Sequence, residues 1–132
     1  MVRRWICGVF VVLAAGCMAP LGAQSAFPFG RDLVLDARPL RGGKRVPILS
    51  IDASGEAQID LWCKRGSGQA VIAGETITII VGNMAEEPCT PERTQADAQL
   101  IAALSQVTSW SYRGDVVTFD GGATLRFRAA AN

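Results

Sequence analysis

Cysteine is the residue type in this chain with the widest choice of chemistry. Four cysteines occur in 132 residues, and two of them, Cys7 and Cys17, lie in or beside an apolar N-terminal stretch. The other two, Cys63 and Cys89, are 26 residues apart. Such a pair could form a structural disulfide, act as a redox couple or contribute to a metal site. The choice depends on the compartment and on the other residues that could join the pair.

The first 23 residues predict export. Arg3 and Arg4 precede an apolar run from Trp5 to Ala15, and small residues follow. This pattern is typical of a secretory signal peptide, and the run is too short to span a membrane. We therefore expect an exported protein, either periplasmic or anchored by a lipid at the outer membrane of a Gram-negative bacterium.

Two cleavage sites compete within this signal. The segment "LAAGC" resembles a bacterial lipobox, whose cleavage would leave Cys17 as a lipidated N-terminus, although Ala14 stands where leucine is more usual. The alternative is ordinary cleavage after Ala23 in "PLGA", which would release a soluble protein that begins at Gln24. We expect the lipidated form, and both forms end in the cell envelope.

In an oxidising compartment, the pair Cys63 and Cys89 favours a structural disulfide. A redox pair usually occurs as Cys-x-x-Cys, which this sequence lacks. A zinc site would need further ligands, and the chain contains no histidine. In the chain-entropy model, closing a loop of this length stabilises a protein by about 3–4 kcal/mol. We therefore expect a stabilising cross-link and no metal or other cofactor.

The composition also argues against catalysis and against nucleic-acid binding. Without histidine, the Ser-His-Asp and Cys-His nucleophile systems are excluded. The acids considered for a glycosidase-like pair fall mostly in predicted turns or on outward strand positions: Asp52, Glu56, Asp60, Glu75, Asp115 and Asp120. The chain carries 13 basic and 12 acidic side chains, so no basic excess attracts nucleic acid or an anionic membrane surface. We expect a protein that is not an enzyme and has no catalytic residues.

A helix over about residues 91–106 is the most regular element that the sequence predicts. Thr90 can cap it, Pro91 suits the first helical position, and Glu92 complements the positive end of the helix. Apolar residues then recur at helical spacing: Ala96, Leu100, Ala103, Leu104 and Val107, with Ile101 beside them. This stripe predicts a helix that packs one face on a core.

Short strands precede and follow the helix. The strand candidates are "VPILSI", "EAQIDLWC", "QAVIA", "ETITIIV", "SWSY", "DVVTF" and "TLRFR". The second alternates strictly, which places Leu61 and Cys63 on the core face and Trp62 on the opposite face. The glycines at 66–68 and the "RGD" at 113–115 are interpreted as turns. The pattern predicts an α+β domain, a small, curved antiparallel sheet of about six to eight short strands with one helix.

These elements resemble the META domain, the HslJ-type family of bacterial envelope proteins. The resemblance lies in "LWCKRGSG", in "NMAEEPCTPER" before "ADAQLIAALSQV", and in "TSWSYRGDVVTFDGGATLRFR". Family members often have Gly-Cys-Asn where this chain has Trp62-Cys63-Lys64, and Met-Ala-Cys without the three residues that precede Cys89. The resemblance implies a domain over 33–132, after a leader or linker over 24–32. It also implies envelope association with links to heat shock, motility and antibiotic tolerance, and it brings no catalytic residue.

We therefore expect a non-catalytic domain that supports stress or antibiotic tolerance by contacts with an unknown envelope protein or ligand, and that meets the membrane only through a lipid anchor. Any binding is expected at a patch of Trp62, Arg65, Arg126 and Arg128, because aromatic and arginine side chains are enriched at binding hot spots. Packing of Trp62 on the second sheet face or on the helix is the structural alternative. The alternative function is inhibition of a hydrolase, such as lysozyme or a protease, through an exposed loop "KRGSGQ" at 64–69.

Mass spectrometry of the mature N-terminus tests the predicted processing. We expect a mature protein that begins at Cys17 and carries lipid, because the lipobox-like segment ends at that cysteine. A mature protein that begins at Gln24 without lipid would keep the prediction of export and contradict the anchor.

Overall fold

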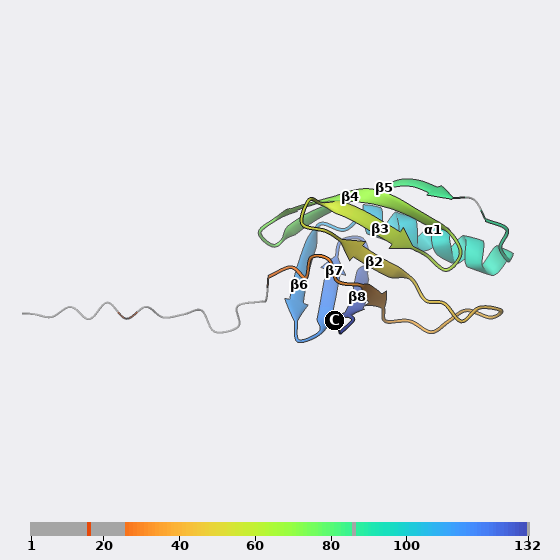
Figure 1. Cartoon of the computed structure of the whole chain (residues 1–132), viewed down its shortest axis with the longest axis horizontal. Helices are drawn as coiled ribbons and strands as arrows, with labels where there is room; N and C mark the ends of the chain where they lie inside the picture. Colours follow the sequence, from red (N-terminus) through yellow and green to blue (C-terminus); the bar gives the residue numbers. More distant parts are fainter. Residues whose placement is uncertain (1–15, 17–25, 86, 132) are drawn as a thin grey trace, which may run out of the picture.

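Figure 1 shows the computed structural model of the chain, which describes residue 16, residues 26–85 and residues 87–131. The predicted signal peptide, apart from Gly16, and the predicted lipidation site Cys17 lie outside the described residues. Within the described ranges, no helix has the length and apolar character needed to cross a membrane.

The described residues form eight strands and one helix, in the order that the sequence pattern indicated. The elements are β1 (Leu33–Leu35), β2 (Ile48–Ile51), β3 (Glu56–Asp60), β4 (Arg65–Ala73), β5 (Thr76–Ala85), α1 (Pro91–Ser105), β6 (Ser109–Arg113), β7 (Val116–Asp120) and β8 (Thr124–Ala129). In Figure 1 the long hairpin of β4 and β5 lies above, with α1 beside it, and β6, β7 and β8 lie below. The expected antiparallel β structure with a single helix is confirmed for this part of the chain.

The sheet closes into a barrel, which corrects the prediction of an open, curved sheet. The strands follow one another in sequence order, and β1 pairs with both β2 and β8. In this register Leu33 lies opposite Leu49 on one side and opposite Ala129 on the other. The closing strand is only three residues long, so it carries too little alternation to be recognised in the sequence. Closure gives every strand two neighbours, although β5 meets β6 only at the residue pair Thr76 and Ser109.

The glycines of "KRGSG" lie inside a strand, so their interpretation as a turn is wrong. Gly66 and Gly68 belong to β4, and the pairing of β4 with β5 shifts register between them. A side chain at Gly66 would collide with the backbone of Asn83, and one at Gly68 with the backbone of Ile80. Glycine is required because the two strands approach closely at this bulge.

The core combines inward strand positions with the buried face of the helix. Completely buried apolar residues come from four strands, β1, β2, β3 and β7: Leu33, Ile51, Ala57, Val117 and Phe119. The rings of Phe119 and Phe127 meet edge to face with centroids 5.5 Å apart. From the predicted helical stripe, Leu100, Leu104 and Val107 are buried. The helix also begins as predicted, because the Thr90 side chain accepts a hydrogen bond from the backbone N–H of Arg93.

Phe27 and Arg31 extend the packed structure into the segment that the sequence assigned to a leader or linker over 24–32. Phe27 is 6% exposed, and its ring meets that of Trp110 edge to face at 5.1 Å. The Arg31 guanidinium donates to the hydroxyl of Tyr112 at 2.8 Å and to the carbonyl of Ala130. The stretch contains two phenylalanines but has no helical or strand periodicity over several residues, so the sequence did not reveal this contact.

Replacing Leu104 with alanine should lower the free energy of unfolding by about 2–5 kcal/mol, because a fully buried side chain is lost from the core. Urea denaturation followed by circular dichroism measures the change. Ser105→Ala is the matched control, since Ser105 is the exposed neighbour on the same helix and its replacement should change stability by less than about 0.5 kcal/mol. Equal losses in the two variants would contradict the assignment of the buried face.

Candidate functional site

The turn that joins β3 to β4, residues 61–64, is buried beneath the helix. The predicted strand "EAQIDLWC" ends at Asp60, three residues earlier than expected. Leu61, Trp62 and Cys63 are all buried, with exposed fractions of 1%, 9% and 5%. Strict alternation therefore stops before Trp62, and the prediction that this side chain emerges on the outer face is wrong. Its structural alternative, packing on the helix, describes the observed position.

Asp97 on α1 holds the backbone N–H groups of this turn. Its side chain is completely buried. The carboxylate accepts hydrogen bonds from the N–H of Cys63, at 3.2 and 3.3 Å, and from the N–H of Lys64, at 2.8 Å. A buried carboxylate is tolerated only with such donors. Asp97 was not among the residues predicted to be functional, although its position three residues before Leu100 and seven before Leu104 places it on the buried stripe.

Arg45, from the loop between β1 and β2, holds the carbonyl groups of the same turn. Its guanidinium donates to the carbonyl oxygens of Leu61 at 3.0 Å, Cys63 at 3.2 Å and Lys64 at 3.5 Å. The turn is closed internally by a hydrogen bond from the N–H of Leu61 to the carbonyl of Lys64, at 2.8 Å. Asp97 on the helix and Arg45 on the loop together provide hydrogen-bond partners for the N–H groups and the carbonyl groups of the turn, which pairs with no strand there.

A disulfide between Cys63 and Cys89 ties the turn to the segment that precedes α1, which confirms the predicted pairing. The Cα atoms of the two cysteines are 6.3 Å apart, within the range usual for disulfides. Cys63 is buried and Cys89 is half-buried. The turn at 61–64 is therefore held by a carboxylate, a guanidinium and a covalent bond.

Trp62 lines an apolar groove of about 410 Å³ between α1 and the ends of β1 and β8. We call this the Trp62 groove. Its lining residues are Leu35, Trp62, Ala96, Gln99, Leu100, Ala103, Ala123 and Leu125. Seven of these are apolar, Gln99 is the polar one, and none is charged. The three alanines leave the space that larger side chains would fill.

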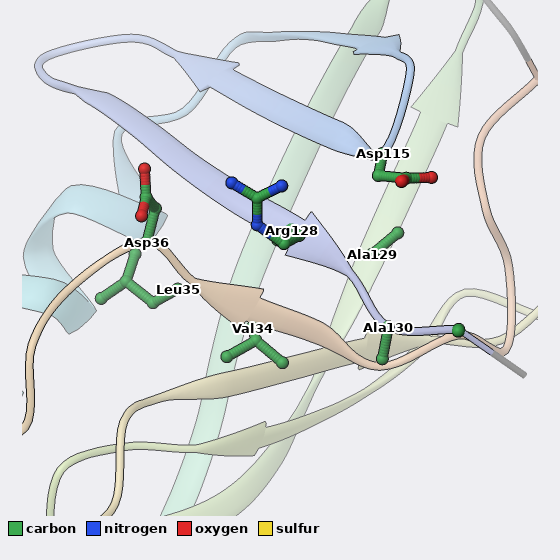
Figure 2. A pocket seen from close by; sticks show the side chains of 8 residues that line it. Val34, Leu35, Asp36, Asp115, Arg128, Ala129 and Ala130 are labelled. Atoms are coloured by element: carbon green, nitrogen blue, oxygen red, sulfur yellow. The ribbon is translucent and has the colours of Figure 1, made fainter.

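Two further recesses follow the Trp62 groove along β1 and β8. The first, of about 300 Å³, shares Leu35 and Leu125 with the groove and is also lined by Asp36 and Arg126. The second, of about 440 Å³, contains Arg128. Figure 2 shows its side chain between those of Asp36 and Asp115.

The structure does not assemble the patch that the sequence predicted from Trp62, Arg65, Arg126 and Arg128. Arg126 and Arg128 are exposed on β8, whereas Arg65 lies on β4, four strands away in the barrel order. Arg65 forms an ion pair with Asp60 of the adjacent strand, at 3.6 Å. Trp62 faces the groove beneath α1. The alternation along each strand points the three arginine side chains outward. Residues that point outward on separate strands need not lie close together.

The segment "KRGSGQ", predicted as an exposed inhibitory loop, is not a loop. Residues 65–69 are the first half of β4, where they pair with both β3 and β5. An inhibitor of the expected kind would insert a protruding loop into an active site, and a strand bonded on both edges cannot do this. The inhibitor hypothesis therefore loses the structural feature on which it rested.

The acids of the described residues serve structural roles where their contacts are defined. Asp52 closes the turn before β3, accepting hydrogen bonds from the hydroxyl of Ser54 at 2.6 Å and from the N–H of Glu56 at 3.0 Å. These bonds, that from the Ser54 side chain first, hold the pKa of Asp52 below its usual value. Among the described residues, no group of three or more His, Cys, Asp or Glu side chains could hold a metal ion.

Comparison with known proteins identifies a family and a fold. The model of the META domain family matches residues 32–132, which confirms the resemblance seen in the sequence. Among solved structures, a DUF4847 family protein from Bacteroides vulgatus ATCC 8482 is similar, with a TM-score of 0.50 and 16% sequence identity. That similarity covers 62% of this chain and 57% of the other, and at this identity it shows the fold alone. No curated protein matches the chain.

Asp97→Ala should lower the free energy of unfolding by about 3 kcal/mol, because it leaves buried N–H groups of the 61–64 turn without an acceptor. Asp97→Asn keeps one carbonyl acceptor and should lose less. Urea denaturation measures both, with Gln95→Ala at an exposed position of α1 as the control. Wild-type stability in Asp97→Ala would show that the turn does not depend on the carboxylate.

Proposed function

The chain belongs to the META domain family, and on that premise we propose that it is a non-catalytic domain of the bacterial envelope that acts by binding. The observation that carries this proposal is the Trp62 groove, a concave apolar surface on a rigidly held turn. Ligand sites are commonly concave and mostly apolar, with a few polar groups that orient the ligand.

The lining of the groove supports binding rather than catalysis. General acid–base and nucleophilic chemistry need a titratable or nucleophilic side chain within reach of the reacting atoms. None of the residues that line the Trp62 groove carries such a group. The nearest buried acid, Asp97, is engaged by the backbone of the 61–64 turn. The groove is therefore suited to hold a molecule and offers no group to transform it.

The envelope location and the stress role belong to the same proposal. The N-terminal signal pattern supports export. The disulfide supports an oxidising compartment, because such bonds persist there and are rare in the cytosol. The link to heat shock and antibiotic tolerance rests on the family resemblance. We propose that the domain contributes to tolerance through what its groove binds.

A complementation experiment tests this function in the bacterium that encodes the protein. Deletion of the gene should reduce survival after heat shock or antibiotic exposure, and the wild-type gene should restore it. Ala103→Leu should fail to restore survival, because the larger side chain occupies the Trp62 groove.

Ala102→Leu is the matched control, since Ala102 is the adjacent exposed residue of α1 and does not line the groove. It should restore survival as well as the wild type does. Equal complementation by both variants, at equal protein levels in the envelope fraction, would contradict a function that depends on the groove.

A further inference from the structure

We propose that the Trp62 groove binds a small, uncharged and largely apolar molecule. This inference rests on the proposed function, because it names the class of ligand for the same site. Four features of the groove carry it: its volume, its lack of charge, its surroundings and its attachment to the clamped turn.

The volume of the groove suits a small molecule. At about 410 Å³ it falls within the range of about 300–1,000 Å³ that is usual for such sites. Leu100 and Trp62 supply apolar surface, and Ala96, Ala103 and Ala123 keep the space between the elements open. A larger residue at any of these alanines would reduce the space, so the small side chains determine the capacity of the groove.

The absence of charge in the lining determines the polarity of the ligand. A charged group moved from water into an apolar recess without a partner loses its hydration, which is costly. The charged side chains of the adjacent recess, Asp36 and Arg126, have opposite signs, so they favour neither an anion nor a cation at its edge. Gln99 can both donate and accept one or more hydrogen bonds. The complementary molecule is neutral and carries a polar group that faces Gln99.

The surroundings of the groove favour a small molecule over a protein partner. A stable protein interface buries roughly 800 Å² on each partner and has an apolar centre. The large apolar side chains exposed among the described residues, Phe29, Val71 and Ile80, all lie away from the groove. The groove and the recess that shares Leu35 and Leu125 with it are thus bordered by the charged side chains of Asp36 and Arg126, without the apolar surround that a protein would cover.

The clamped turn makes the groove a preformed site. Asp97, which bonds the turn next to Trp62, lies on the same helix as Gln99 and Ala103. The helical residues that line the groove are therefore linked to the turn that carries Trp62 by direct hydrogen bonds. A site that needs no rearrangement loses less free energy on binding, because fewer groups have to be ordered.

Two fluorescent probes with the same ring system test the inference. N-phenyl-1-naphthylamine is neutral, and 8-anilinonaphthalene-1-sulfonate adds one negative charge. With the full-length processed protein, the neutral probe should show a saturable rise in fluorescence with one site per chain, and the sulfonate should bind at least about tenfold more weakly. Ala103→Leu should weaken binding of the neutral probe by at least about tenfold, whereas Ala102→Leu should leave it within about twofold.

Ala96→Leu provides a second groove variant, used if thermal unfolding shows that Ala103→Leu is not folded. Lack of saturable binding of the neutral probe, equal binding of the two probes, or unchanged binding in a folded groove variant would each overturn the inference. The proposed function is tested separately: if Ala103→Leu still failed to complement while the neutral probe did not bind, a macromolecular partner would occupy the groove.

Discussion

The buried carboxylate of Asp97 bonds the helix of this domain to a turn of its barrel. It accepts hydrogen bonds from consecutive backbone N–H groups at the turn between β3 and β4, where the strand ladder is interrupted. The N–H of Cys63 is buried and that of Lys64 is partly buried, so the loss of their acceptor would leave them without the hydrogen bonds that water provides in the unfolded chain. The contact thus links α1 to the turn that contains Trp62, beside the groove that both of them line.

Three interactions of different kinds constrain the same turn. Asp97 binds the N–H groups, Arg45 binds the carbonyl groups, and the disulfide joins Cys63 to Cys89 ahead of the helix. The two side chains specify where the turn lies, whereas a disulfide acts mainly by restricting the unfolded chain. Small domains with a limited core gain most from such constraints. The proposed binding groove lies beside this turn, because Trp62 belongs to both.

The barrel and the groove have a common origin in the way the sheet closes. β1 is short, and its last residue, Leu35, reaches both the helix side and the start of β8. Residues of α1, the end of β1 and the start of β8 line one groove. The groove is the space that remains between them, because the helix presents alanine rather than a larger residue at two of the positions that face it.

The sequence by itself determined most of the elements, the cross-link and the family. Alternation over five or more residues and a fifteen-residue helix are local patterns, so β6, β7, β8 and α1 could be recognised from the residues alone. Two cysteines in a chain that is predicted to be exported and has no histidine left few alternatives to a disulfide. Only the tertiary structure decided the rest. Barrel closure depends on a three-residue strand that pairs across nearly the whole length of the chain. The place of Trp62 depends on a turn whose bonding partners, Asp97 and Arg45, are 33 and 19 residues from Lys64 in the sequence. Local periodicity carries no information about such distant contacts, and these contacts create the groove.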